Sequence, residues 1–169
     1  MRHTIIVFLL ALLSIPAAHA TYSVAEVPNV HLQDSLRFTS DPAGILSQDA
    51  IKHIDASLHR AWLSASAEPV VVVIDSADTD DLDDYATRLF TAWGIGKKDK
   101  DNGVLILISR DQRQAVIRTG RGAEGVLPDA YCSRIIRNVM APEFREENYD
   151  QGTIKAVDAG VEILTNTDN

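Results

Sequence analysis

Apolar residues recur every three or four positions in several stretches of the chain, which is the spacing of an amphipathic helix. One such stretch runs from Ile51 to Trp62, and Ser47 precedes it as a residue that can accept a hydrogen bond from the first turn. Similar spacing covers residues 85–93 and 149–164, and Pro128 is placed to open another helix. The pattern therefore predicts four helices after residue 47.

Continuous apolar runs alternate with these helices. The segments Val70–Ile74, Val104–Ile108 and Ala115–Thr119 are rich in β-branched residues, which favours buried strands. A helical connection joins the first two strands, so they should be parallel, whereas the short connection 110–114 makes the third strand antiparallel. We therefore predict an α/β fold: a single three-layer α/β/α sandwich whose small mixed sheet is flanked by helices.

The N-terminus has the features of an export signal. Arg2 and His3 are followed by an almost wholly apolar segment, and Ala18-His19-Ala20 has the small-x-small pattern that signal peptidase accepts. We expect cleavage after Ala20, which gives an exported, periplasmic or secreted protein with no stable membrane anchor. Residues 1–20 are then the signal peptide, 21–40 an extended lead-in, and 41–169 the domain.

Composition limits the classes of function. Of the 169 residues, 46% are apolar, which is enough for one core. The 24 acidic and 16 basic residues give a formal charge of −8, which argues against nucleic acid as a partner. Cys132 is the single cysteine, so no internal disulfide can form, and a small buried apolar side chain is the simpler interpretation than a reactive thiol.

Acidic residues in two turns are candidates for a metal site. The antiparallel third strand should return its end to the edge where the second strand begins, which brings Asp101 near Glu124 and Asp129. Oxygen ligands of this kind suit Ca²⁺, with Mg²⁺ as the alternative. The competing interpretation is structural: Asp101 forms a turn, Glu124 pairs with an arginine, and Asp129 stabilises a helix start.

Other familiar catalytic patterns find little support. No G-x-S-x-G motif or phosphate-binding loop is present. The segment Gly120–Gly125 matches G-x-G-x-x-G, but it follows a strand that arrives from a hairpin rather than one that opens a dinucleotide-binding unit. The residues alone therefore leave the function open.

Four motifs in order give the chain a resemblance to a known family. They are Asp41–Ser47 (DPAGILS), Tyr85–Gly96 (YATRLFTAWGIG), Asp101–Leu105 (DNGVL) and Gly120–Asp129 (GRGAEGVLPD). Together they resemble the TPM domain family, which includes a thylakoid-lumen protein linked to photosystem II repair and many exported bacterial proteins. The resemblance implies an α/β/α sandwich outside the cytoplasm. It also implies a divalent-ion site, often for calcium, carried here by Asp41, Asp101 and Glu124, with Asp129 as an addition.

Three functions fit these observations. The first is an exported domain that binds a divalent cation, Ca²⁺ in the first instance, and acts as an interaction or maintenance module with an envelope or membrane protein. The second, implied by the acid phosphatase description of the plant branch, is a metal-assisted phosphomonoesterase. The third is a structural domain whose acidic turns bind nothing.

Overall fold

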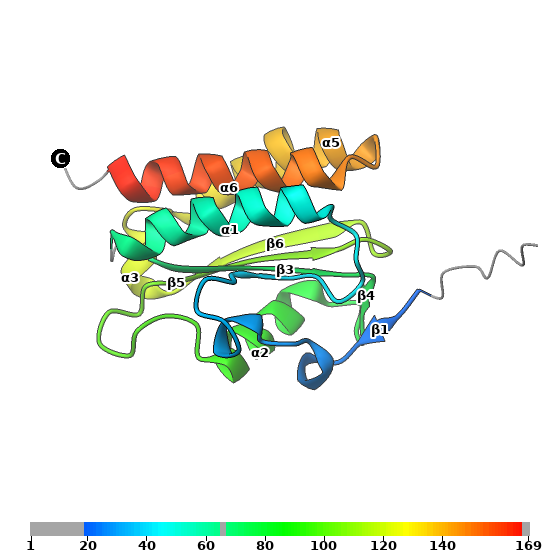
Figure 1. Ribbon diagram of the computed structural model, residues 1–169, viewed down its shortest axis with the longest axis horizontal. Helices are drawn as coiled ribbons and strands as arrows, with labels where there is room; N and C mark the ends of the chain where they lie inside the picture. The colour runs from blue at the N-terminus through cyan, green and yellow to red at the C-terminus, as the bar shows by residue number, and fades with distance from the viewer. Residues whose placement is uncertain (1–18, 65–66, 167–169) are drawn as a thin grey trace, which may run out of the picture.

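The computed structural model describes residues 19–64 and 67–166. It confirms the three-layer α/β/α arrangement, with α1 and α6 on one face of the sheet and α2 on the other (Figure 1). The strands are β1 (Thr21–Tyr22), β2 (Thr39–Ser40), β3 (Glu68–Ile74), β4 (Ser76–Ala77), β5 (Gly103–Ser109) and β6 (Gln114–Thr119). The helices are α1 (Gln48–Leu63), α2 (Leu82–Trp93), α3 (Arg121–Glu124), α4 (Asp129–Ile135), α5 (Ala141–Arg145) and α6 (Tyr149–Asn166). Short 3₁₀ turns η1 (Val24–Glu26) and η2 (Val30–Leu32) and a π-helical turn η3 (Ile136–Met140) complete the set.

The main sheet has the strand order β2-β3-β5-β6. The first three strands are parallel and β6 is antiparallel, as the mixed sheet predicted from the sequence requires. Glu68 pairs with Gly103 and Ile74 with Ser109, so β3 and β5 begin and end together. We call the edge where β2, β3 and β5 end the carboxyl edge, and the edge where β3 and β5 begin the amino edge.

Local signals fix the ends of the two long crossover helices. The Ser47 hydroxyl accepts a hydrogen bond from the Ala50 N–H at 3.1 Å, as predicted for the start of α1. The Asp81 carboxylate accepts one from the Asp84 N–H at 2.9 Å at the start of α2. Gly94 ends α2 with a φ of 60°, a conformation that glycine adopts without a steric penalty.

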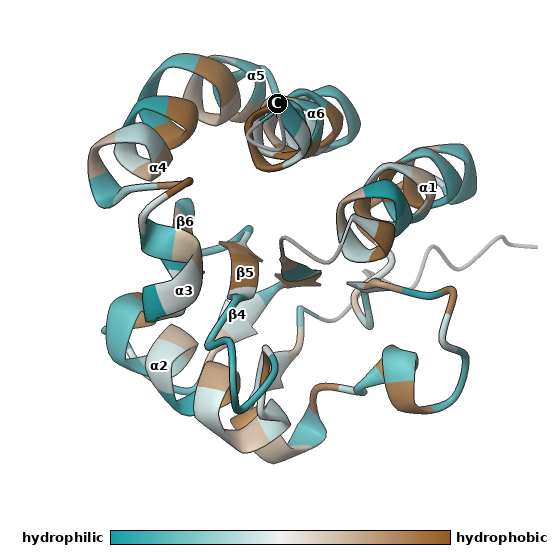
Figure 2. Cartoon of the chain, turned by 90° about the vertical axis from the view of Figure 1, so that its left-hand side faces the viewer, coloured by the Kyte–Doolittle hydropathy of each residue, from teal (hydrophilic) through white to brown (hydrophobic). Residues whose placement is uncertain are grey.

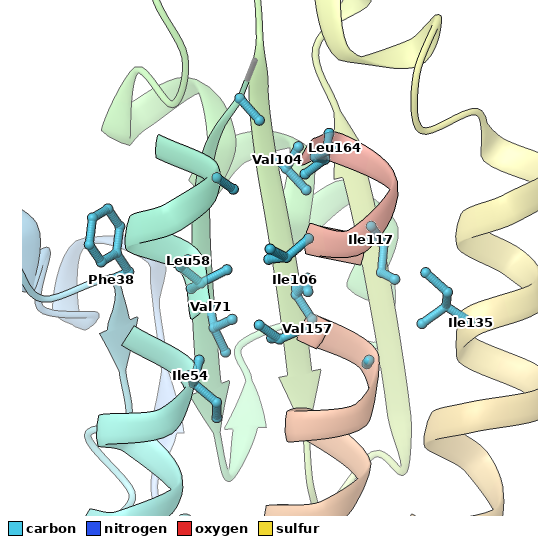
Figure 3. Packing of buried hydrophobic residues seen from close by; sticks show 14 of the residues in the cluster. Phe38, Ile54, Leu58, Val71, Val104, Ile106, Ile117, Ile135, Val157 and Leu164 are labelled. Carbon is cyan, nitrogen blue, oxygen red and sulfur yellow. The ribbon is translucent and has the colours of Figure 1, made fainter. Parts of the chain in front are cut away.

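Two apolar cores lie on opposite faces of the sheet. The larger one packs α1, α6 and α4 against the sheet side chains of Val71, Ile106 and Ile117 (Figure 3). The smaller one packs α2 against the other face, where Tyr85 and Leu89 are fully buried. Because β3 and β5 contribute residues to both cores, these strands are apolar at almost every position.

The segment 21–40, expected to be an extended lead-in, contains more structure than that. It forms η1 and η2, and its last residues form β2, the outer strand of the main sheet. β1 pairs with β4 in a separate two-stranded sheet beyond the end of β3. Residues 1–18 of the predicted export signal lie outside the described residues. None of the helices within the described ranges is both long enough and apolar enough to cross a membrane.

Cys132 lies in α4 and is buried against the larger core, which confirms the interpretation of this residue as a small apolar side chain. Burial raises the pKa of the thiol to about 11, and the negative charge of Asp129 adds to the rise. The reactive form of a cysteine is the thiolate, so this thiol is inert at neutral pH.

Candidate functional site

The carboxyl edge has the geometry of a binding crevice. The chain leaves β2 towards α1 and leaves β3 towards α2, and these two helices lie on opposite faces of the sheet (Figure 2). Neighbouring parallel strands whose connections diverge in this way leave a gap between their ends, and ligands of open α/β sheets bind in such gaps. The first residues after these strands, Asp41 and Asp75, are both acidic.

Backbone hydrogen bonds continue the β3–β5 pairing into this edge and place a third carboxylate there. The Arg110 N–H donates to the Ile74 carbonyl at 3.0 Å, and the Asp111 N–H donates to the Asp75 carbonyl at 2.8 Å. Asp111 therefore lies beside Asp75 although 35 residues separate them in sequence. The position follows from the register of the two strands, because Ile74 pairs with Ser109.

His19, Asp75 and Asp111 form a compact group of potential metal ligands. One ligand atom from each lies within 4.8 Å of the other two, and within the described ranges this is the one such group of three or more His, Cys, Asp or Glu side chains. His19 Nδ1 is 2.8 Å from Asp111 Oδ2, and the Ala20 N–H donates to Asp75 Oδ2 at 3.0 Å. Imidazole and carboxylate side chains are common ligands of divalent cations.

Arg110 partly neutralises this group. Its guanidinium donates to Asp75 Oδ1 in a tight ion pair, and its Nε lies 3.4 Å from Asp111 Oδ1. The Asp75 side chain is only 6% exposed, whereas that of Arg110 is 30% exposed. The buried carboxylate thus depends on an arginine that reaches it from solvent.

Asp41 adds a further negative group at the same edge. Its carboxylate accepts hydrogen bonds from the Ile45 N–H at 3.1 Å and the Leu46 N–H at 2.8 Å, which closes the turn into α1. Burial raises the pKa of Asp41, the amide bonds partly oppose that rise, and the charge of Asp75 adds to it. The pKa of Tyr22 is raised by burial and then by the negative charges of Asp75, Asp41 and Glu26.

At the amino edge, the two turns predicted to meet do lie together. The Gly122 N–H donates to the Asp101 carbonyl at 2.8 Å, and the Arg121 N–H lies 3.3 Å from Asp101 Oδ2. Asp101 has a φ of 49°, which belongs to a tight turn. The carboxylate of Asp101 therefore closes a loop against the chain after β6.

The four predicted metal ligands are divided between the two edges. Asp41 lies at the carboxyl edge, while Asp101, at the amino edge, precedes the first paired residue of β5 by two positions. Glu124 ends α3 and is exposed, and Asp129 lies in the first turn of α4. Among the described residues, Asp101, Glu124 and Asp129 do not bring three ligand atoms within 4.8 Å of one another. A shared ion at the amino edge stays a prediction.

Sequence reasoning did not select His19, Asp75 or Asp111. Asp75 directly follows the predicted strand Val70–Ile74, at the opposite edge of the sheet from Asp101. The signal that could have identified its neighbour was available. Parallel strands of equal length end side by side, and Asp75 is the first residue after β3 while Asp111 is the second residue after β5.

Comparisons with known proteins agree with this architecture. A TPM domain matches residues 39–163. The N-terminal domain of a protein from P. gingivalis is 37% identical over 88% of this chain and 94% of that domain, with a TM-score of 0.81. Two further solved structures have the same fold. The N-terminal domain of the cg2496 protein from Corynebacterium glutamicum is 20% identical over 83% of this chain and 86% of that domain, with a TM-score of 0.61. The BA42 protein from Bizionia argentinensis is 23% identical over 72% of this chain and 82% of that protein, with a TM-score of 0.62. No curated protein matches the chain. Since the match spans most of the sequence, the chain belongs to the TPM domain family.

Proposed function

We propose that this protein is an exported domain that binds a divalent cation at the carboxyl edge of its sheet and acts as an interaction module in the cell envelope. The observation that carries the proposal is the convergence of Asp75 and Asp111 next to Asp41, with His19 beside them in the uncleaved chain. The carboxylates come from the ends of neighbouring strands, so the scaffold holds them in place without a ligand.

Export would change the ligand set. If signal peptidase cleaves after Ala20, the mature chain loses His19 and the amide of Ala20, both of which contact the aspartates. The remaining ligands are carboxylate oxygens, which suit Ca²⁺ or Mg²⁺ better than zinc. The mature protein should therefore prefer a hard cation, whereas the uncleaved chain offers an imidazole as well.

Arg110 would limit the affinity of this site. A cation that binds Asp75 and Asp111 must displace or repel the guanidinium that now contacts both. Since the Arg110 side chain is 30% exposed, it can move into solvent. Weak binding, of the strength seen in extracellular calcium modules, is the expected outcome.

Calorimetric titration of the chain beginning at Thr21 with CaCl₂ and with MgCl₂ tests the proposal. We expect saturable binding of Ca²⁺ and a higher melting temperature at millimolar ion, because a ligand that binds only the folded state stabilises it. Asp111→Asn should weaken binding by at least about tenfold.

Two variants serve as controls for that titration. Asp49→Asn removes an exposed carboxylate of α1 and should leave binding unchanged. Asp101→Asn tests the amino edge, and it should also bind normally. Loss of binding in Asp101→Asn with full binding in Asp111→Asn would contradict the carboxyl-edge site, as would the absence of heat with both ions.

A metal-assisted phosphomonoesterase is the second candidate, and one observation favours it. Arg110, Asp111 and Arg113 line a hollow of about 520 Å³ at the carboxyl edge, and guanidinium groups are suitable ligands for a phosphate. We expect the mature protein, loaded with Ca²⁺ or Mg²⁺, not to turn over an aryl phosphate above background. Ion-dependent turnover that disappears in Asp111→Asn would establish the phosphatase instead.

A further inference from the structure

The described part of the chain contains a cavity of about 410 Å³ that the cation site does not use. It lies between the start of β6 and the arm formed by η3 and α5. Its apolar lining consists of Ala115, Ile136, Met140, Ala141 and Phe144. Its polar lining includes Arg113, Arg145, Glu147 and Tyr149. A volume of this size is typical of sites for small organic molecules.

Unusual backbone conformations gather around this cavity. Three non-glycine residues of the described ranges have positive φ, and two of them, Arg113 (52°) and Glu147 (57°), line it. The π-helical turn η3 contributes Ile136 and Met140. Both features cost free energy, and both occur at functional sites more often than elsewhere. None of these residues belongs to the four sequence motifs quoted above.

The apolar wall of the cavity is held in place by its neighbours. Phe144 stacks on Tyr149 with ring centroids 4.8 Å apart. Gly152 in α6 leaves room for the Phe144 ring, since a Cβ atom at that position would lie 2.8 Å from Phe144 Cδ1. Met140 is fully buried beside the core. The cavity therefore exists before any ligand enters it, which lowers the cost of binding.

The charges at the cavity are unpaired. Arg113 and Arg145 are both exposed, and no carboxylate oxygen of the described residues lies within 4.0 Å of either guanidinium group. Glu147 is the one carboxylate on the lining, so the local charge is positive in a chain whose formal charge is −8. Two unpaired arginines at the mouth of an apolar cavity are complementary to an anionic group on an apolar body.

We propose that this cavity binds an amphiphilic organic anion. The apolar body of the ligand would lie against Ile136, Met140 and Phe144, and its anionic head would bind Arg113 and Arg145. A fatty carboxylate and a monoalkyl phosphate share this chemistry. The inference does not depend on the cation site, because no carboxylate of that site is needed for it.

Calorimetric titration of the purified protein with decanoate, decyl phosphate, decanol and decyltrimethylammonium, in the presence of EDTA, tests the proposal. We expect one saturable site for the anions and at least about tenfold weaker binding of decanol, since a charge-assisted pair contributes that much. Decyltrimethylammonium, which carries a positive charge, should not bind. Tighter binding of decyl phosphate than of decanoate would identify a phosphate ester as the natural ligand class, and the reverse order a carboxylate.

Variants locate the site. Arg145→Gln should weaken decanoate binding by at least about fivefold, while Arg137→Gln, an exposed arginine of η3 that does not line the cavity, should not change it. Ala141→Trp should fill the cavity and abolish binding. Because Ala141→Trp can also disturb folding, Arg145→Gln provides an independent test of ligand binding at an exposed position. Equal affinity for decanol and decanoate, or normal binding in Arg145→Gln, would overturn the proposal.

Discussion

Replacing Gly122 by alanine should lower the free energy of unfolding by about 3 kcal/mol, because the loop after β6 packs directly on the loop before β5. A Cβ atom at position 122 would overlap the carbonyl oxygen of Lys100 and would lie 3.1 Å from that of Asp101. The obstacle is backbone, so no side-chain rotation can relieve it. Urea unfolding followed by circular dichroism measures the loss.

The same motif provides a matched control. Gly125 lies three residues later with a φ of −64°, and a Cβ atom there would meet nothing within 4 Å. Gly125→Ala should therefore leave stability unchanged or raise it by less than about 1 kcal/mol, through the reduced freedom of the unfolded chain. Equal stabilities of the two variants would show that the contact between the two loops is not tight in solution.

Replacing Arg110 by methionine should destabilise the protein by about 3 kcal/mol, because it leaves the carboxylate of Asp75 buried without its partner. A loss of about 3 kcal/mol is at the lower end of the range for breaking a buried ion pair, because the Arg110 side chain is itself 30% exposed. The free energy of unfolding in urea at pH 7 is the measurement.

A double variant distinguishes the loss of the Asp75–Arg110 ion pair from other effects of the Arg110→Met substitution. Asp75→Asn combined with Arg110→Met removes the unpaired charge, so it should be more stable than Arg110→Met alone. Arg88→Met breaks the exposed pair with Asp84 in α2 and should cost less than about 1 kcal/mol. If Arg110→Met were as mild as Arg88→Met, water would have to reach Asp75 in the native state.

The main architecture could be predicted because each element carries its own signal. α1 begins after Ser47, α2 begins within its aspartate run, and β3 and β5 are apolar at nearly every position. β2 was not predicted, because two residues show no periodicity and this strand exists only through its pairing with Val71 and Val72. The π-helical turn η3 could not be predicted from the sequence either. It lengthens the side-chain spacing of α4 by only one residue, which is too small a change to recognise in the apolar pattern.

The candidate site could be predicted only where the sheet register determines it. The contact of the Asp101 turn with the loop at Gly122 follows from the antiparallel pairing of β5 and β6, and sequence reasoning found it. The convergence of Asp75 and Asp111 follows from the equal lengths of β3 and β5, which the sequence suggests but does not fix. The part played by His19 depends on whether the predicted cleavage after Ala20 takes place, and that is a question of processing rather than of folding.

The brevity of β2 has a consequence for self-association. β2 covers only Val71 and Val72 along the outer side of β3, and both of its residues are about 1% exposed. The Ser40 hydroxyl donates to the Pro28 carbonyl at 2.6 Å, so the chain before β2 folds over this side of the sheet. Exposed strand edges are templates for the addition of foreign strands. The segment 21–40 thus covers part of the outer edge of β3, and its removal by proteolysis should expose that edge to the addition of a strand from another molecule.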